Sequence, residues 1–427
     1  MGTQNVPTLH ISGKWQMEHL TVTAAQQRVL ETAKLLGTES VKLEQSLGRV
    51  LAEDIRANRD QPPYDVSAMD GFALRSADVT SAPATLEVIE DIKAGDMPAK
   101  TVQVGQCARI MTGAPVPPGA DTVIRVEDTQ AMSDTRVQIN VSVKPNNDIR
   151  PRGESMRDGE VVLTNGSEIT PGAVGMLAMV KRNTVQVYRQ PRVAILSTGD
   201  ELEGLNDPFD ANKIPDANSY ALMAQVQALG IRPVLLGIAR DKPEELRRYL
   251  LDGLKYDALL VSGGTSVGVH DYVRPTLEAL GVQMKFWRVE MKPGHPMAFG
   301  FKDSAFVFGL PGNPVSGMVC FEQFVLPALR RMMGHTRIHR RTIAARLAHD
   351  VKHKHNRTEF VRVMLSKDAG GYVVTSAGDQ GSGILASMSK ADGLMIVPAA
   401  CKGVAAGSSV MVQLLDGASY QNEAGVE

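Results

Sequence analysis

The sequence predicts a multidomain α/β protein whose central domain is a three-layer αβα sandwich with a mainly parallel sheet. Between residues 191 and 334, apolar β-branched runs alternate with amphipathic helical segments, which is typical of a parallel sheet covered on both faces. Short strands broken by glycine and proline precede this region, and period-two alternation follows it. We therefore expect three further parts: a split helical and extended N-terminal domain, a small β domain inserted into it, and a barrel-like β domain at the C-terminus.

The composition excludes several classes of protein. The chain has 427 residues, 43% of them hydrophobic and 22% charged, which is ordinary for a globular protein of about three domains. The 46 lysines and arginines nearly balance 47 acids, so we expect no nucleic-acid or membrane partner. Three widely separated cysteines exclude a disulfide scaffold and a CxxC site. No signal peptide or membrane span is recognisable, so a cytoplasmic protein is expected.

The N-terminal domain is predicted to span residues 15–57 and 145–190. Residues 23–36 carry apolar side chains at close to a 3.6-residue period, which predicts a packing helix. Residues 40–55 are interpreted as a second helical piece. A short helix at 171–177 can pair with these helices, and that pairing would make the β region between them an insertion.

The two β domains are predicted over residues 58–144 and 335–427, from short runs bounded by turn residues. Strands of the inserted domain are expected at 86–89, 108–111, 122–126 and 137–141. Strands of the C-terminal domain are expected at 360–365, 372–375 and 394–397.

The αβα domain is predicted over residues 191–334. Helices are expected from Asn218, from Asp241 and over 314–333, and Asp241 with Glu244 three residues later is typical of a capping box. Strands are expected at 193–196, 233–238, 258–261 and 305–308. In such sheets, ligands bind beyond the carboxyl ends of the strands.

The segments that follow these strands are rich in glycine and acids. The first strand runs into STGDE at 197–201, the third into SGGTSVGVHD at 262–271 and the last into GLPGNP at 309–314. Glycine-rich turns expose N–H groups to phosphate oxygens, and carboxylates hold Mg²⁺ against those oxygens. Each feature alone has a plainer explanation, such as a helix cap or a tight turn. Their combination at one rim favours a phosphorylated ligand with a metal.

A competing motif is GTSVG at 264–268, which fits the nucleophile elbow of serine hydrolases with Ser266 as nucleophile. The elbow requires a helix to begin at once, whereas the next helix is expected only after Asp271. Walker A, HExxH and GxGxxG motifs are absent. Histidines 349, 353 and 355 lack metal-ligand spacing and are interpreted as a polar strand edge.

Several of these segments resemble the MoeA-type molybdopterin molybdenumtransferases, whose eukaryotic relatives include the E domain of gephyrin. The strings SAMDG and GLPGNPVS are long and specific, and the matches follow the family order over nearly the whole chain. The matching stretches are PYDVSAMDGFA at 63–73, IMTGAP at 110–115, RPRGE at 150–154, STGDEL at 197–202, SGGTSVGVHDY at 262–272, KPG at 292–294 and GLPGNPVS at 309–316.

The resemblance implies a reaction in which adenylyl-molybdopterin and molybdate give molybdenum cofactor and AMP with a divalent cation, usually Mg²⁺. It also implies an elongated homodimer whose active site lies between the αβα domain of one subunit and the SAMDG region of the other. Expected protein partners are the molybdopterin adenylyltransferase and downstream proteins that insert the cofactor. A non-catalytic scaffolding relative is the alternative within the same family.

The resemblance also implies the site residues, carried over position by position. The catalytic set is Asp70, Thr112, Glu201, Asp241, Asp271 and Lys292. The substrate-binding set is Ser67, Gly263, Gly264, Ser266, Arg288, Pro311, Pro314, Arg362 and Ser382. The metal ligands are Glu201, Asp241 and Asp271.

The chemistry of these side chains suits the implied substrates. Molybdate is a dianion, so we hypothesise that Lys292 and Arg288 hold it, while Asp271 and Asp241 position a Mg²⁺-pyrophosphate. Three positions depart from the common family pattern: Ser155 replaces an acid, and Arg288 and His295 replace lysines. Arginine keeps the charge with a different geometry, whereas histidine is mostly neutral at pH 7.

Overall fold

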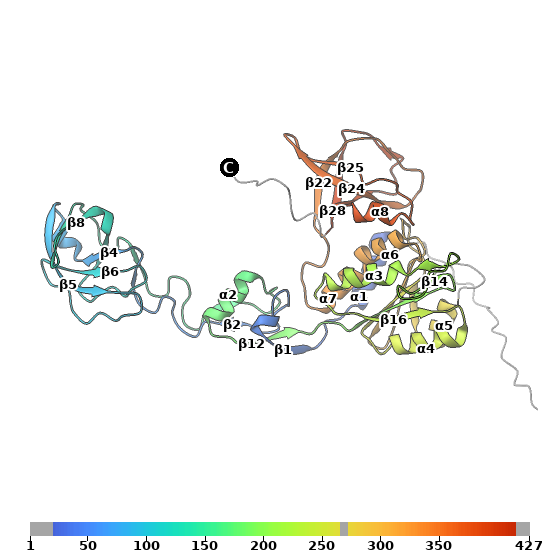
Figure 1. The fold of residues 1–427 in the computed structure, drawn as a ribbon, viewed down its shortest axis with the longest axis horizontal. Coiled ribbons are helices and arrows are strands. Elements are labelled where there is room, and N and C mark those ends of the chain that lie inside the picture. Colours follow the sequence, from blue (N-terminus) through green and yellow to red (C-terminus); the bar gives the residue numbers. More distant parts are fainter. Residues whose placement is uncertain (1–19, 265–271, 416–427) are drawn as a thin grey trace, which may run out of the picture. The chain divides into compact units, whose positions relative to one another are not determined.

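A computed structural model describes residues 20–264 and 272–415 of the chain (Figure 1). It divides into two compact units, one formed by residues 40–187 and the other by the segments on either side. Strands β1 (Thr38–Lys42) and β12 (Thr184–Tyr188) pair where the chain passes from one unit to the other. No helix in the described part of the chain is long and apolar enough to cross a membrane.

A six-stranded sheet forms the centre of the larger unit. Its strands lie in the order β16, β13, β17, β21, β20, β18; the first four are parallel to one another, and β20 pairs antiparallel with both of its neighbours, β21 and β18. The mainly parallel sheet predicted from the sequence is confirmed. The bounds are β13 (Val193–Thr198), β16 (Val234–Ala239), β17 (Ala258–Ser262), β18 (Gln283–Phe286), β20 (Ala298–Lys302) and β21 (Ala305–Leu310).

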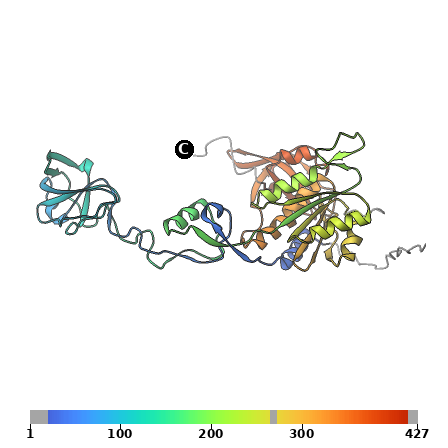
Figure 2. The same cartoon turned by 60° about the horizontal axis from the view of Figure 1, so that its bottom comes forward.

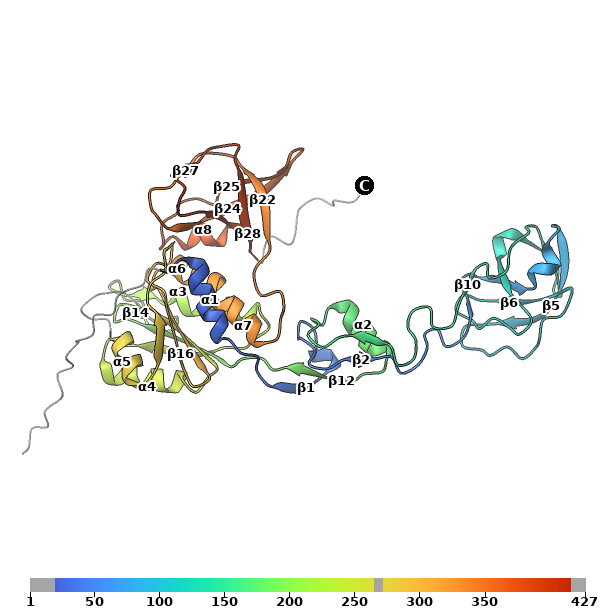
Figure 3. The same ribbon diagram turned by 180° about the vertical axis from the view of Figure 1, so that it is seen from behind.

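Both faces of this sheet are covered by helices. On β13, Val193 and Ile195 pack into one apolar core and Ala194 and Leu196 into another, because successive strand residues point to opposite faces. Helices α1, α3, α6 and α7 cover the first face, and α4 and α5 cover the second (Figure 3). The bounds are α1 (Val22–Thr32), α3 (Ala217–Gln227), α4 (Pro243–Gly253), α5 (Val273–Ala279), α6 (Pro314–Cys320) and α7 (Leu326–Met332).

The C-terminal part of this unit is a closed barrel. Strand β24 pairs with both β25 and β26, and β22 and β28 complete the ring. Strand β19 (Met291–Lys292), which belongs to the αβα domain, adds to β24. The remaining bounds are β22 (Thr342–Leu347), β23 (Val351–Lys352), β24 (Thr358–Asp368), β25 (Gly371–Ser376), α8 (Leu385–Ser389), β26 (Gly393–Val397), β27 (Gly403–Val404) and β28 (Ser409–Leu414). Two further short strands of the αβα domain are β14 (Leu202–Glu203) and β15 (Ile214–Pro215).

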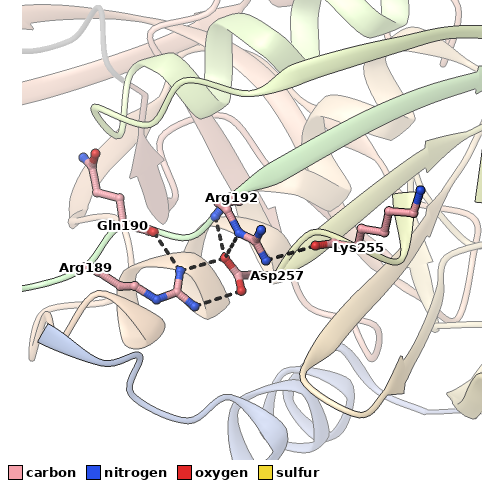
Figure 4. Close-up of polar contacts among 5 residues, drawn as sticks. All are labelled: Arg189, Gln190, Arg192, Lys255 and Asp257. Atoms are coloured by element: carbon pink, nitrogen blue, oxygen red, sulfur yellow. Dashed lines mark hydrogen bonds and ion pairs between the residues drawn. The ribbon is translucent and has the colours of Figure 1, made fainter. Parts of the chain in front are cut away.

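A buried carboxylate fixes the segment through which the chain enters the αβα sheet (Figure 4). Asp257 immediately precedes β17 and is 4% exposed. Its oxygens accept hydrogen bonds from Arg189 Nη1 and Nη2 at 2.8 and 2.9 Å and from the Arg192 backbone N–H at 2.7 Å. Burial would raise the pKa of this carboxyl, but the hydrogen bonds from the two arginines lower it to about 2.

The smaller unit contains the inserted β domain, drawn in cyan in Figure 2. Its sheet has the order β7, β4, β6, β5, β9, β8. The strands are β4 (Gly71–Leu74), β5 (Ala84–Ile92), β6 (Gln106–Ile110), β7 (Thr122–Arg125), β8 (Thr129–Ser133) and β9 (Arg136–Ile139), with 3₁₀ turns at Ser76–Val79 and Val126–Asp128. Strand β4 was not predicted, although it lies between β6 and β7 and pairs with both.

The remaining elements of the smaller unit correct one helix prediction. Residues 40–55 do not form a helix, because Gly48 turns the chain with a φ of 74° and Val50 and Leu51 form β-bridges with Glu168 and Val187. These long-range pairings replace the local hydrogen bonds that a helix would have made. The elements are a 3₁₀ turn at Leu43–Gln45, β2 (Ile55–Arg56), β3 (Val66–Ser67), β10 (Ile149–Arg150), β11 (Val161–Leu163) and α2 (Pro171–Met179).

Helix α1 packs into the core of the αβα domain. Its buried residues Ala25 and Val29 belong to the apolar core that contains Phe321 and Phe324 of the αβα domain. The helix ends at Thr32, and the backbone N–H of Leu36 then donates to Met332 O at 2.9 Å. The apolar stripe of α1 therefore packs into the core of the larger unit, whereas α2 packs with residues such as Leu51 in the smaller unit.

The three thiols are expected to differ in reactivity. Cys107 and Cys320 are buried, whereas Cys401 is partly exposed. Burial raises the pKa of Cys107 to about 12 and raises the pKa of Cys320 further, which removes the reactive thiolate. Iodoacetamide at pH 8 should therefore modify only Cys401 in the folded protein, as peptide mass spectrometry will show. Native labelling of Cys107 at the rate of Cys401 would contradict this packing, and Cys401→Ser is the control.

Candidate functional site

The carboxyl ends of three parallel strands form a polar rim on the αβα domain. Asn218 Nδ2, from α3, donates to Ser262 Oγ at 2.7 Å and to Gly312 O at 2.8 Å. The backbone N–H of Gly263 donates to Leu310 O at 3.1 Å. The turns after β17 and β21 therefore lie side by side, with the start of α3 against both.

The turn after β17 requires its two glycines. Gly263 and Gly264 have φ values of 91° and 61°, which side chains disfavour. A Cβ at Gly263 would lie 2.6 Å from Thr198 O, and one at Gly264 would lie 2.2 Å from Val273 Cγ2. The turn therefore packs closely against the end of β13. Ser266 and Asp271, which belong to the same sequence motif, lie outside the described residues.

Acidic residues lie on the same rim after β13 and β16. The backbone N–H of Asp241 donates to Asp200 Oδ1 at 3.2 Å. The carboxylate of Glu201 folds back over Gly199, where a Cβ would lie 2.4 Å from Glu201 Oε2. Arg240 fastens the two loops by donating to Leu202 O at 2.7 Å. Two of the three predicted metal ligands thus share one rim.

The predicted capping box at Asp241 is wrong. Helix α4 begins after Lys242, which makes no side-chain capping bond, because an ammonium group donates hydrogen bonds and cannot accept one from the first turn of the helix. Glu245, rather than Glu244, reaches back, and its Oε1 accepts from the backbone N–H of Arg240 at 3.2 Å. Asp241 is therefore part of the rim and not of the helix cap.

The carboxylate oxygens of this rim are of the kind that bind Mg²⁺ in phosphate-binding sites. Mg²⁺ takes oxygen ligands and is bound by one or two carboxylates together with substrate phosphates. Glu201 and Asp241 provide such carboxylates, with Asp200 beside them. Across residues 20–264 and 272–415, no group of three histidine, cysteine or acidic side chains converges as a complete metal site.

A pocket of about 480 Å³ opens where the αβα domain meets the barrel. The αβα domain contributes the loop 291–296 and residues that follow β21, and the barrel contributes Arg357 and the loop 379–382. Three predicted residues line it: Lys292, Pro311 and Ser382. Pro314 opens α6 next to it, where the backbone N–H of Val315 donates to Ser382 O at 3.1 Å.

Arg362 supports this pocket from behind. Its side chain is buried, and Nη2 donates to Asp379 O at 3.2 Å and Gly381 O at 3.0 Å. Burial lowers the pKa of Arg362, against the opposing charges of Glu359 and Asp379. The guanidinium thus fixes the loop that carries Ser382. Arg288, also predicted to bind substrate, is partly exposed and is not among the described residues that line the pocket.

Lys292 is paired with a buried acid. Its Nζ lies 2.9 Å from Glu359 Oε1, and His353 Nδ1 lies 2.8 Å from the other oxygen of the same carboxylate. Burial alone would raise the pKa of Glu359, but the hydrogen bonds from Lys292 and His353 outweigh it and lower the pKa. His353 is therefore a buried partner of this acid, and its interpretation as part of a polar strand edge is wrong.

Sequence reasoning did not identify Arg357 as a pocket residue. Its Nε lies 3.0 Å from Glu290 Oε2, and its Nη2 lies 3.4 Å from His295 Nε2. His295 Nδ1 lies 2.7 Å from Val289 O, so Nδ1 carries the proton and Nε2 can accept from the arginine. The pocket thus has two cations in its wall. The nearby EFVR string was the only signal for this arginine.

A second cluster of predicted residues lies in the smaller unit. Asp70 Oδ1 accepts hydrogen bonds from the backbone N–H of Thr112 at 2.7 Å and from Thr112 Oγ1 at 2.9 Å, and both bonds lower the pKa of Asp70. The backbone N–H of Gly113 donates to Ser67 O at 2.8 Å. The SAMDG and MTGAP segments therefore lie side by side. A Cβ at Gly71 would lie 1.9 Å from Ile124 O, so only glycine fits there.

An αβα domain with acids and glycine turns at its strand ends, beside a pocket whose wall holds a lysine and an arginine, is typical of enzymes that act on anionic ligands. Family models agree in detail: the MoeA N-terminal region (domains I and II) matches residues 20–180, the probable molybdopterin binding domain matches 194–331, and the MoeA C-terminal region (domain IV) matches 344–415. The chain belongs to the MoeA family and is a transferase.

Individual relatives cover almost the whole chain. A molybdopterin molybdenumtransferase of Staphylococcus aureus (strain Mu50) is 33% identical over 409 residues, which is 95% of this chain and 97% of the relative. The enzyme of that name from Bacillus subtilis (strain 168) is 34% identical over 93% of this chain and 94% of its own length. A crystal structure of the MoeA protein from Pyrococcus horikoshii OT3 has a TM-score of 0.80 at 29% identity, covering 93% of this chain and 100% of that one.

Proposed function

We propose that this chain is a molybdopterin molybdenumtransferase that combines adenylyl-molybdopterin with molybdate to give molybdenum cofactor and AMP. The observation that carries the proposal is the pocket where Lys292, Arg357 and Ser382 meet. A tetraoxo dianion requires cations and hydrogen-bond donors in one place, and this pocket combines them. The names of the relatives support the transfer of molybdenum to molybdopterin.

The αβα rim is proposed to hold the phosphorylated substrate. The turns at Gly263 and Gly312 bring backbone close to the strand ends, where N–H groups can receive phosphate oxygens. Glu201, Asp241 and Asp271 are the proposed ligands of Mg²⁺. When bound, Mg²⁺ neutralises charge on the phosphate oxygens. The same rim thereby fixes the phosphoanhydride that is cleaved to release AMP.

Each remaining residue has a distinct proposed task. Lys292 and Arg357 attract molybdate to the pocket, and Ser382 offers a hydroxyl donor there. Arg362 keeps the Ser382 loop in place through its bonds to backbone carbonyls. In the smaller unit, Thr112 orients the Asp70 carboxylate and keeps it ionised, so that Asp70 can accept a proton or a hydrogen bond from substrate.

We also propose that the chain acts as a homodimer in the cytoplasm. Its substrate would come from the molybdopterin adenylyltransferase, and its product would pass to proteins that insert the cofactor. The family membership supports this arrangement. Light scattering coupled to size-exclusion chromatography should give twice the 46.0 kDa mass of the chain, and a monomer would contradict the proposal.

The reaction is tested directly with purified protein. In the presence of adenylyl-molybdopterin, molybdate and Mg²⁺, AMP release should require molybdate and should stop when EDTA removes the divalent cation. Sulfate in place of molybdate is the matched control, because it is also a tetraoxo dianion. Binding of molybdate without AMP release would instead indicate the scaffolding alternative.

The hydrolase alternative has its own test. Labelling of Ser266 by a fluorophosphonate probe would favour it. Among the described residues, the helix that follows this turn begins at Val273, later than a nucleophile elbow needs.

A further inference from the structure

Glu359 is a buried acid that contacts Lys292 in the wall of the anion pocket. Its side chain is 8% exposed, whereas that of Lys292 is 41% exposed on the side of the pocket. The two residues are direct partners in the pairing of β19 with β24, so their side chains stand next to each other. The carboxylate therefore neutralises a cation that the pocket presents to its ligand.

The second oxygen of this carboxylate is occupied by His353. The His353 side chain has no exposed surface and reaches Glu359 Oε2 through Nδ1 at 2.8 Å. Since a carboxylate accepts and does not donate, Nδ1 carries the proton. The other ring nitrogen, Nε2, has no hydrogen-bond partner among the described residues. His353 thus holds the Glu359 carboxylate in place from the side away from Lys292.

We propose that Glu359 sets the affinity of the anion pocket for tetraoxo dianions, because its carboxylate competes with them for the positive charge of Lys292. The inference rests on the proposed function, which supplies molybdate as the dianion. Glu359 is not among the residues that line the pocket, so it acts through charge and through Lys292. With this acid present, charge alone contributes less to binding, and the fixed donors of the pocket contribute a larger share.

The competing effect is preorganisation of the lysine. Loss of the carboxylate frees the Lys292 side chain, which must then be ordered again when the dianion binds. A negative charge beside a bound dianion repels it, and this repulsion is stronger where the site excludes water. We therefore expect the loss of charge to dominate, so that removing the acid strengthens anion binding.

Calorimetric titration of the full chain with sodium molybdate tests the proposal. Glu359→Gln keeps the size of the side chain and should lower the Kd for molybdate about tenfold. It should tighten sulfate binding as well, because the gain comes from charge and not from shape. Asp368→Asn is the matched control: it removes an acid from the exposed far end of the same strand, where Asp368 pairs with Arg346, and should leave the Kd unchanged.

A double variant separates this effect from a merely structural one. In Lys292→Ala the acid stays at the pocket without its cation, so adding Glu359→Gln should recover at least about tenfold of the lost affinity. If Glu359→Gln does not fold, two variants with apolar replacements give the same comparison. The first carries Lys292→Met alone, and the second carries Lys292→Met together with Glu359→Met. Unchanged or weaker molybdate binding on removal of the acid would overturn the inference. Absence of molybdate binding by the wild-type chain would instead overturn the proposed function.

Discussion

Replacing Lys292 with alanine is expected to lower kcat/KM for molybdate about 100-fold. The ammonium is the pocket cation that the αβα domain contributes, and its removal takes away the charge-assisted donor that we propose for the dianion. It also leaves the buried Glu359 carboxylate at the pocket with only His353 as partner. Both consequences act in the same direction. Steady-state AMP release at varied molybdate concentration measures the effect.

The control for this variant is Lys367→Ala. Lys367 lies near the far end of β24 and is exposed, so its removal changes the net charge of the chain equally without touching the pocket. The control should keep wild-type kinetics. Equal losses in both variants would show that net charge, and not Lys292, sets the affinity. Wild-type kinetics of Lys292→Ala would remove this residue from the proposed site.

Replacing Asp257 with asparagine is expected to lower the free energy of unfolding by about 2 to 3 kcal/mol. The amide keeps the shape of the carboxylate but loses the charge that Arg189 and Arg192 contact. Both arginines are partly exposed, with 33% and 64% of their side chains accessible, so water offsets part of the loss. Urea unfolding followed by tryptophan fluorescence, to which Trp287 of the αβα domain contributes, measures the change.

The effect of this variant should depend on pH. The pKa of Asp257 is about 2 in the folded protein, against 3.8 for an ordinary aspartate, so the contribution of the ionised form is complete above about pH 5. It is lost as the pH falls toward 2, where the carboxyl becomes protonated in both states. The stability difference between wild type and variant should shrink accordingly.

Asp252→Asn is the matched control for Asp257. Asp252 forms an ion pair with Lys255 on the surface, where both side chains are more than half exposed, and such pairs contribute about 0 to 1 kcal/mol. A loss of stability as large as that of Asp257→Asn would show that general charge, and not the buried contact, is responsible. A stability difference between the wild type and Asp257→Asn that stays constant with pH would show that the ionised carboxylate is not responsible.

The sequence was most informative where a structural element carries its own periodic signal. Strands β13, β17 and β21 are five- or six-residue buried runs, and a continuous apolar run identifies a strand that is covered on both faces. Strand β4 is only the four residues 71–74, too short for any periodicity. Residues 40–55 led to the opposite error. Their side chains favour a helix, but β-bridges to distant segments replace the hydrogen bonds of that helix.

The same distinction holds for the site. The glycine turn at 263–264 and the acids after β13 are adjacent to recognisable strands, so their shared rim follows from the parallel topology. The pairing of Lys292 with Glu359 depends instead on β19 reaching β24 across the 65 residues between the two strands, which leaves no local pattern. His353 was misjudged for the same reason. The roles of Asp70, Thr112 and Ser382 came from the family resemblance and stay predictions.

The two-residue strand β19 couples ligand binding to the contact between the αβα domain and the barrel. Because it crosses from the αβα domain into the barrel sheet, the anion pocket has walls from two folding modules. A dianion that binds in this pocket contacts both modules. Its binding free energy is therefore added to the free energy needed to separate them. Substrate supply and the integrity of this junction are thereby thermodynamically linked.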